Sequence, residues 1–195
     1  MNKKMILAFP VLLILVSSCS YRLDTRKLLL GCYWQDCVPE RNFHVLDWKI
    51  PVDMFPNGAK VSDMMIPSEG KGEIESGDQN IFWDNGNSSA IYLINRYPTI
   101  KAAVAEYQRI LKLMVEDETK TPWTSPSDSA FSSTTADEFL IACGNWTFEK
   151  RCGVAARYQE YVILFHETMD EKTLYSDFEK IAVYLDGQLS QRLYP

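Results

Sequence analysis

Two long stretches of the chain carry apolar residues at the spacing of an amphipathic α-helix. In residues 98–118 and 174–193, apolar side chains recur every three or four positions, which places them along one side of a helix. These positions are Ile100, Val104, Tyr107, Leu111 and Met114 in the first stretch, and Leu174, Phe178, Ile181, Leu185 and Leu189 in the second. Thr99 is in the position of an N-cap for the first helix. The sequence therefore predicts two helices that each bury one face.

The second predicted helix carries candidate signals for its start and for a weak point. Ser176 and Glu179 have the spacing of a capping box, in which two side chains satisfy backbone N–H groups at the start of a helix. Gly187 lowers helix stability by about 1 kcal/mol relative to alanine. We therefore expect the helix to fray from Gly187 onward.

Shorter apolar runs predict five strands. Residues 80–97 contain two β-rich runs around Asn85-Gly86-Asn87, and Asn-Gly is a strong hairpin signal because tight turns need positive φ. Three more runs follow, at residues 136–144, 152–158 and 161–169. The last two are separated by a tight bend at Gln159-Glu160. The order β-β-α, loop, β-β-β-α predicts an α+β fold, an antiparallel sheet with two amphipathic helices packed on it.

Two segments are predicted to lack regular structure. The first, residues 38–72, contains Pro39, Pro51, Pro56 and Pro67. We expect it to lie extended over the domain surface, with one short strand at residues 43–50. The second is a Ser/Thr/Pro-rich loop at residues 119–135, and loops of this length are often functional.

Two aromatic residues, Trp123 and Phe131, lie inside this second polar loop. They either dock on the body of the domain or remain exposed for a partner. Exposed aromatic rings are favoured in binding hot spots. Our hypothesis is that both are partner contacts, in which case Trp123→Ala leaves the thermal stability nearly unchanged.

The N-terminus has the layout of an export signal. A basic head, Lys3-Lys4, is followed by an apolar run at residues 5–16 and by the small residues Ser17-Ser18. This order is typical of secretory signals. The apolar run is shorter than the roughly 20 residues that a membrane-spanning helix requires. We therefore expect residues 1–18 to be a signal peptide.

Residues 16–19, Val-Ser-Ser-Cys, resemble the lipobox of bacterial lipoproteins. The resemblance implies that the Cys19 thiol receives a diacylglyceryl group, that a signal peptidase cuts before Cys19, and that the new amino group is acylated, for example with palmitate. Several acyl chains anchor a protein firmly to a membrane. The resemblance also implies the outer membrane if the source is Gram-negative, because Ser20 stands where Asp would favour the inner one. The alternative is a plain secreted protein without lipid.

The other four cysteines form two local pairs, Cys32/Cys37 and Cys143/Cys152. Five cysteines is an odd number, so assigning Cys19 to lipid leaves an even set. Export places this set in an oxidising compartment, where disulfides persist. We expect two structural disulfides. The alternatives are a zinc site, whose usual ligand spacing these pairs match poorly, and free or otherwise paired thiols.

Length and charge further narrow the class of protein. Removing 18 of the 195 residues leaves enough chain for one domain. We expect a lipidated tether at residues 19–31 and a single globular domain at residues 32–195. Removing Lys3 and Lys4 from the 20 basic residues leaves 18 against 26 acidic ones, a formal net charge of −8. No basic cluster remains, so nucleic acid is not an expected partner.

Residues that could carry catalysis are few. His44 lies in an irregular segment, and His166 ends an apolar strand. Its neighbour Glu167 should point to the opposite face of the sheet, so the two do not form a base and its orienting partner. We interpret His166 as a structural histidine. No nucleophile motif, phosphate-binding loop or metal motif occurs.

Residues 80–193 resemble the PsbP/LpqN-type domains of exported bacterial proteins in their pattern of strands and a terminal helix. The tight bend within "ARYQEYVILF" is part of that resemblance. It implies an accessory or binding role and assigns no site residues. We therefore expect a lipid-anchored, non-catalytic envelope protein without cofactor or metal, which binds an envelope protein or a small ligand. The alternatives are an exported enzyme with a dispersed site and a plain secreted protein.

Overall fold

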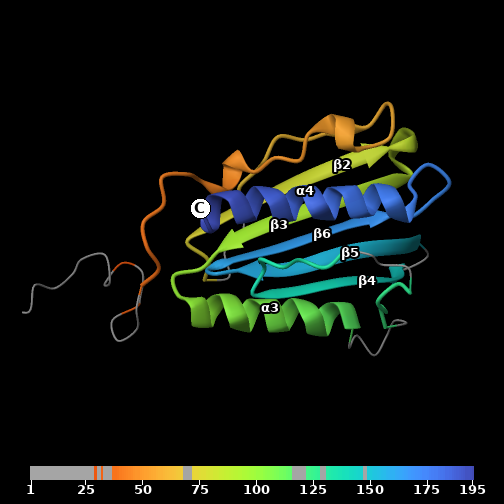
Figure 1. Cartoon of the computed structure of the whole chain (residues 1–195). Helices are drawn as coiled ribbons and strands as arrows, with labels where there is room; N and C mark the ends of the chain where they lie inside the picture. Colours follow the sequence, from red (N-terminus) through yellow and green to blue (C-terminus); the bar gives the residue numbers. More distant parts are fainter. Residues whose placement is uncertain are drawn as a thin grey trace, which may run out of the picture. The chain divides into compact units, whose positions relative to one another are not determined.

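An antiparallel β-sheet organises the chain after Cys37 in the computed structural model (Figure 1). Its six strands lie in the order β1-β2-β3-β6-β5-β4, and each pairs antiparallel with its neighbour. The strands are β1 Lys60–Val61, β2 Glu75–Trp83, β3 Ser88–Arg96, β4 Glu138–Trp146, β5 Glu149–Tyr158 and β6 Tyr161–Thr168. The structure describes residues 29, 32, 37–67, 72–115, 122–127, 131–146 and 149–195, and every count refers to these residues.

The chain divides into two units, Met1–Cys37 and Val38–Pro195. The second unit contains the sheet and the helices α3 (Ile100–Val115) and α4 (Tyr175–Leu193). None of the helices in the described part of the chain combines the length and the apolar character that a membrane span requires. The predicted signal peptide and Cys19 lie outside the described residues.

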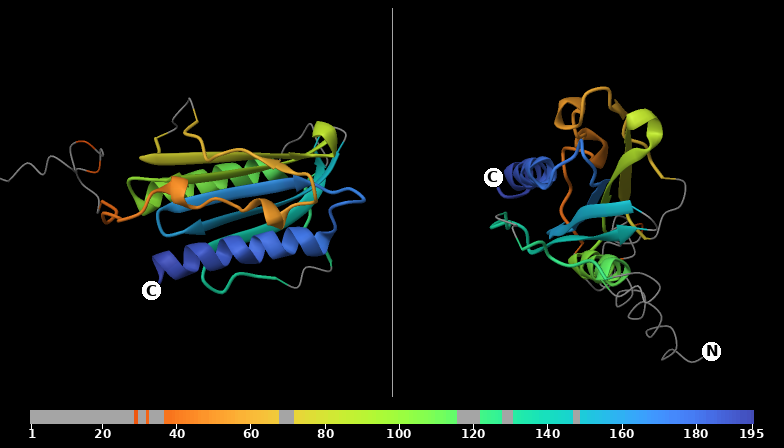
Figure 2. Two further views of the ribbon diagram at one scale, coloured as in Figure 1. Left: turned by 90° about the horizontal axis from the view of Figure 1, so that it is seen from above. Right: turned by 90° about the vertical axis from the view of Figure 1, so that its right-hand side faces the viewer.

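The two helices lie on opposite faces of the sheet. α4 and the segment at residues 38–67 cover one face, and α3 packs on the other face against β5 and β6 (Figure 1, Figure 2). The core of the α4 face includes Tyr92, Phe165, Phe178 and Leu185. The core of the α3 face includes Ala103, Tyr107, Ala155 and Val162. This arrangement confirms the predicted α+β fold and the order of the five long strands and two helices, whereas the two-residue edge strand β1 was not predicted.

The helix α3 begins as predicted but buries a slightly different stripe. Thr99 caps the helix, since its Oγ1 accepts a hydrogen bond from the Ala102 N–H at 3.1 Å. The buried positions are Ala103, Tyr107, Ile110 and Met114. Ile100, by contrast, is 44% exposed. The four buried side chains share one apolar cluster with Ala155 of β5 and Val162 of β6, the two strands that the helix contacts.

The helix α4 differs from the prediction at its start and at Gly187. Asp177 Oδ2 accepts the Leu174 N–H at 3.3 Å, so the predicted capping box of Ser176 and Glu179 is wrong. The helix also continues through Gly187 to its end, and the expected fraying is absent. It is held there by apolar side chains that are buried against the sheet: Leu185, Leu189 and Leu193.

Both predicted chain reversals are present. The β2–β3 hairpin turns at Asp84–Gly86, where all three residues have φ between 52° and 91°. The β5–β6 hairpin turns at Gln159-Glu160, and Gln159 has a φ of 53°. The Asn-Gly signal therefore identified a true hairpin. Positive φ occurs at Asp84 as well as at Asn85 and Gly86.

The segment at residues 38–67 covers one face of the sheet and also places six side chains in the interior, which its prediction as an extended surface layer did not include. It has no strand at residues 43–50 but a 3-10 helix, η1, at Val45–Asp47, followed by η2 at Val52–Met54. Its buried side chains are Val38, Val45, Trp48, Ile50, Phe55 and Met64. Gln79 on β2 explains the missing strand. Its Oε1 accepts a hydrogen bond from the Ile50 N–H at 2.9 Å, and its Nε2 donates one to the Ile50 carbonyl oxygen at 3.2 Å. These two hydrogen bonds take the place of pairing with a neighbouring strand.

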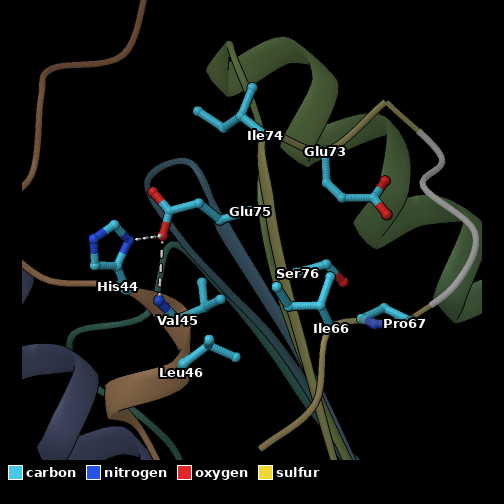
Figure 3. Close-up of a pocket in the computed structure, with 9 residues that line it drawn as sticks. All are labelled: His44, Val45, Leu46, Ile66, Pro67, Glu73, Ile74, Glu75 and Ser76. Carbon is cyan, nitrogen blue, oxygen red and sulfur yellow. Dashed lines mark hydrogen bonds and ion pairs between the residues drawn. The ribbon is translucent and has the colours of Figure 1, made fainter.

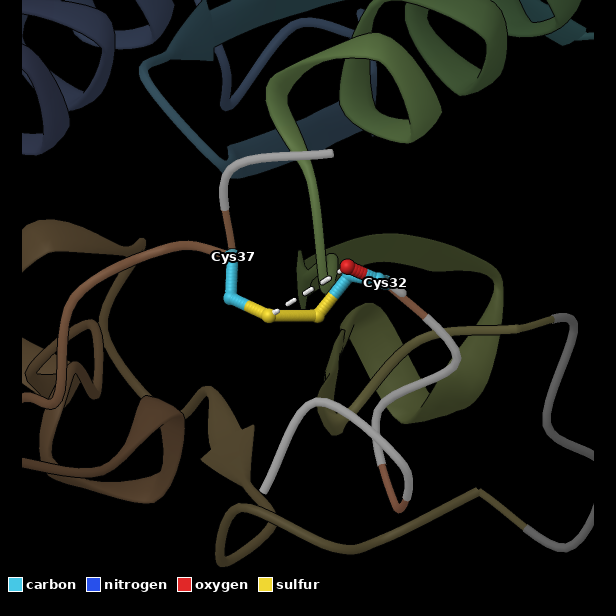
Figure 4. The surroundings of a disulfide bond; sticks show 2 residues. All are labelled: Cys32 and Cys37. Carbon is cyan, nitrogen blue, oxygen red and sulfur yellow. Dashed lines mark hydrogen bonds between the residues drawn. A yellow bond between two sulfur atoms is a disulfide. The ribbon is translucent and has the colours of Figure 1, made fainter. Parts of the chain in front are cut away.

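The four cysteines outside the signal region pair as predicted. Cys32 and Cys37 close a short loop, with Cα atoms 5.7 Å apart (Figure 4). Cys143 and Cys152 are directly opposite on β4 and β5, with Cα atoms 4.0 Å apart. Antiparallel strands approach most closely at non-hydrogen-bonded pairs. The second disulfide therefore ties the edge strand β4 to the interior of the sheet.

Candidate functional site

A groove lies between α3 and the α3 face of β3 and β6. It has a volume of about 310 Å³, which is at the small end of the range for ligand pockets. Its apolar lining includes Leu93, Ile110, Leu113, Met114, Val162 and Leu164. Trp123, Trp146 and His166 line it as well. The groove is therefore mainly apolar, with aromatic rings among its walls.

The register of β3 and β6 places the floor of the groove and its polar groups. The opposite pairs on this face are Ile91 with His166, Leu93 with Leu164, and Asn95 with Val162. Asn95 is four positions further along β3 than Ile91, which corresponds to about 13 Å. Leucines therefore form the middle of the floor, and His166 and Asn95 lie at its two ends.

His166 is held firmly at its end of the groove and is only 6% exposed. Its Nδ1 lies 2.9 Å from Arg151 Nη1. Its ring stacks on Trp146, with 5.5 Å between centroids, and meets Trp123 edge-on at 6.4 Å. Burial lowers the pKa of His166 to about 4, with a further contribution from the positive charge of Arg151. The imidazole is therefore neutral at neutral pH.

Arg151 is buried behind His166, and its charge is balanced. Its Nη2 donates to Glu149 Oε2 at 3.0 Å and to Ser89 Oγ at 2.7 Å. Thr168 Oγ1 also donates to Glu149 Oε2, at 3.1 Å. This network fixes the guanidinium and, through it, the orientation of the His166 ring.

The opposite end and the rim of the groove are polar. Ser76 Oγ donates to Asn95 Oδ1 at 2.5 Å. Arg109 forms two hydrogen bonds to Glu106 along the exposed side of α3. Leu113, on the same helix, is 55% exposed and lines the groove. An apolar side chain thus remains accessible at the groove, on the same helix as a charged pair whose members neutralise each other.

Trp123 is a core residue, so the hypothesis that its ring is exposed is wrong. Its side chain is 5% exposed and lies against the backbone of two strands at Gly144 and Gly153. A Cβ atom at Gly153 would come within 2.9 Å of Trp123 Cζ3. Glycine inside a strand often marks such a close approach. The ring docks because these two glycines leave a flat, apolar surface on the sheet.

Of the polar loop at residues 119–135, the structure describes residues 122–127 and 131–135, and the first of these parts contacts the edge strand β4. Thr124 pairs with Cys143 of β4 through two backbone hydrogen bonds of 2.9 Å and 2.8 Å. Exposed strand edges are prone to pair with other chains. This part of the loop therefore covers an edge of the sheet.

Phe131 lies on the α4 face, whereas Trp123 lies on the α3 face. The Phe131 N–H donates to Glu179 Oε1 at 2.8 Å, and its ring packs edge-on against Phe139 at 5.4 Å. The two aromatics thus dock on opposite sides of the sheet. They do not form one contact surface, and only Trp123 lines the groove.

Glu167 follows His166 on β6 but lies on the α4 face, as strand alternation predicts. It is fully buried, and neither carboxyl oxygen has a hydrogen-bond partner among the described residues. Burial raises its pKa to about 8, and the nearby carboxylates of Asp177 and Asp170 add to this effect. It lines a separate cavity of about 320 Å³. His166 and Glu167 therefore do not act on one substrate.

His44 lies at a further hollow, of about 330 Å³, beside the start of β2 (Figure 3). Its Nδ1 is 3.5 Å from Glu75 Oε2, which also accepts the Val45 N–H at 3.2 Å. Glu75 is neutralised by Arg96 at 2.6 Å. The two histidines therefore lie at different sites. Among the described residues, no group of three His, Cys, Asp or Glu side chains is placed to hold a metal ion.

Sequence reasoning did not predict the groove. Two signals for it were present in the sequence, namely Gly144 and Gly153 inside predicted strands, and the alternation that puts Leu164 and His166 on one face. The interpretation of His166 as a structural histidine agrees with its Nδ1 atom, which is hydrogen-bonded to Arg151. Nothing in the sequence indicated that Leu113 would be exposed beside the groove, because the exposure of a helix residue depends on what the helix packs against.

Comparison with known proteins leaves the groove to be interpreted from its geometry. No protein-family model matches the chain, and no curated protein matches its sequence. The described residues form a mainly apolar groove with polar groups at its ends and rim, and apolar pockets with placed polar groups are typical of sites for small ligands.

Proposed function

We propose that this protein is a non-catalytic binding protein of the bacterial envelope, anchored by lipid on Cys19, and that the groove beside α3 binds a small, largely apolar ligand. The observation that carries the binding role is the apolar groove itself, with Leu113 accessible at its entrance. Preformed apolar pockets with a few fixed polar groups are typical of ligand-binding proteins. The network behind His166 preorganises one such group.

The proposed anchor places the binding domain outside the cytoplasm. The lipobox-like residues 16–19 support lipidation, and the two disulfides agree with an oxidising compartment. Ser20 favours the outer membrane in a Gram-negative source. A protein tethered in this way can meet apolar ligands at the membrane surface.

A fluorescent apolar probe, N-phenyl-1-naphthylamine, tests the groove. We expect Leu113→Glu to weaken probe binding at least fivefold, because a carboxylate at the entrance would lose water contacts when the groove is filled. Val183→Glu is the matched control, since Val183 is 47% exposed on α4, on the other face of the sheet. Both variants should fold, because surface substitutions change stability little. Equal loss in both variants, or in neither, would contradict the assignment of the groove.

Metabolic labelling with a fatty acid tests the anchor. We expect wild-type protein to incorporate the label and Cys19→Ala to incorporate none and to accumulate as uncleaved precursor, because only the thiol accepts the diacylglyceryl group. Cys19 is outside the four cysteines that form disulfides, so folding should be unaffected. Equal label in the two proteins would rule out lipidation at this position.

A further inference from the structure

The protonation state of His166 follows from its neighbour. Arginine carries hydrogen-bond donors and no acceptor. Because Arg151 Nη1 lies 2.9 Å from His166 Nδ1, Nδ1 must accept, and the ring hydrogen of the neutral imidazole is on Nε2. The ring therefore presents an N–H donor at Nε2.

Among the described residues, the ring of His166 forms one hydrogen bond, which joins Nδ1 to Arg151. The Nε2–H group has no partner there. Trp146 covers a face of the ring, and Trp123 meets it edge-on. His166 itself lines the groove. Nε2 has no hydrogen-bond partner among these residues and yet is not fully buried, so we take it to be reached from the groove that His166 lines, and a ligand acceptor there would complete its hydrogen bonding.

The charge around His166 favours an uncharged acceptor. The positive charge of Arg151 is already compensated by Glu149 at 3.0 Å. At the rim of the groove, Arg109 is likewise paired with Glu106. A ligand carboxylate entering this site would lose its hydration without finding an unpaired cation among these residues. A carbonyl oxygen accepts the same hydrogen bond at a much smaller desolvation cost.

We infer that the groove selects uncharged apolar molecules that carry a carbonyl oxygen, such as acyl esters, amides or ketones, and that His166 Nε2–H binds this oxygen while the chain lies over Leu93 and Leu164. This inference rests on the proposed function, because it concerns the ligand class of the same groove. It makes His166 the residue that determines specificity, and the apolar floor the source of most of the affinity.

Displacement of N-phenyl-1-naphthylamine by three probes of similar length tests this inference. 2-Octanone offers a carbonyl oxygen, 1-chloroheptane offers only a weak acceptor, and octanoate adds a negative charge. We expect wild-type protein to prefer 2-octanone over 1-chloroheptane by about fivefold, the effect of one neutral hydrogen bond. We also expect octanoate to bind more weakly than 2-octanone.

Two variants assign the preference to the N–H group. His166→Phe keeps an aromatic ring against Trp146 but removes the donor, so we expect the preference for 2-octanone to disappear. His166→Gln can accept from Arg151 through its oxygen and donate through its amide nitrogen, so we expect it to retain the preference. Any of four results would overturn the inference. Wild type could bind 2-octanone and 1-chloroheptane equally, or bind octanoate more tightly than 2-octanone. Alternatively, the preference for 2-octanone could survive in His166→Phe or be lost in His166→Gln. In each of these cases binding of the fluorescent probe would leave the proposed function intact, whereas absence of probe binding to wild type would remove both.

Discussion

Replacement of Trp123 by alanine should lower the free energy of unfolding by about 3–5 kcal/mol, the usual loss for a large buried aromatic side chain. Trp123 is 5% exposed and fills the space above Gly144 and Gly153, so its removal leaves a cavity that two strands cannot close. This loss is a large part of the about 5–15 kcal/mol that stabilises a typical domain. Urea unfolding followed by circular dichroism measures it.

Two further variants separate packing of Trp123 from a general effect of aromatic loss. Trp146→Ala removes a ring that is 40% exposed, so we expect a loss below about 2 kcal/mol. Gly144→Ala leaves Trp123 in place but puts a Cβ atom into its ring, so we expect destabilisation of about 1–3 kcal/mol from overpacking. An unchanged stability of Trp123→Ala would show that this ring is exposed and would restore the loop as a recognition surface.

Glu167→Gln should stabilise the protein at alkaline pH. The ordinary pKa of a glutamate is 4.5, and burial raises that of Glu167 to about 8. Between these values the folded protein keeps a proton that the unfolded chain has released, so the stability of the wild type falls as the pH rises. At about 1.4 kcal/mol per pKa unit, the full loss is about 5 kcal/mol. A glutamine is neutral at every pH and avoids this loss.

The comparison of Glu167→Gln with wild type is clearest between pH 6.5 and 8.5. His166 has the opposite dependence, because its lowered pKa makes stability fall as the pH drops from 6.5 toward 4. Above pH 6.5 this contribution is constant. We expect the wild type to lose stability over this range and the variant to remain level, as measured by thermal unfolding at each pH. Parallel curves for the two proteins would mean that Glu167 ionises normally in the folded state.

The fold was predictable because its signals are local. Alternation and helical spacing depend on neighbouring residues, and they identified the five long strands and both helices. The Asn85-Gly86 turn and the Gln159-Glu160 bend were found for the same reason, since each needs an unusual φ at one place. The local cysteine pairing also followed from sequence spacing, because both disulfides close short segments.

Apart from the start of α4, where Asp177 rather than Glu179 caps the helix, the failures concern contacts between distant residues. The segment at residues 38–67 looked like a surface layer because of its prolines, but Gln79, far along the chain, holds Ile50 into the core. Trp123 looked exposed because its own loop is polar, and only the approach of Gly144 and Gly153 makes a place for it. The residues next to Ile50 and Trp123 in the sequence do not indicate that Gln79, or Gly144 and Gly153, will contact them.

The candidate site could be predicted only in part for the same reason. Its floor requires β3 to pair with β6, two strands separated by a helix, a loop and two further strands. The alternation of Leu164 and His166 was visible, but the pairing of Arg151 with His166 Nδ1 depends on the β5–β6 register. The donor at Nε2 follows from that pairing.

The most direct test of the proposed binding site is a nuclear magnetic resonance titration of the tryptophan indole N–H signals with 2-octanone. Trp123 and Trp146 line the groove on the α3 face, whereas Trp48 and Trp83 are buried in the core of the α4 face. If the groove binds the ligand, the signals of Trp123 and Trp146 will shift in a saturable manner, and those of Trp48 and Trp83 will remain in place. Shifts confined to Trp48 and Trp83, or no shift at any of the four, would contradict a binding site in this groove.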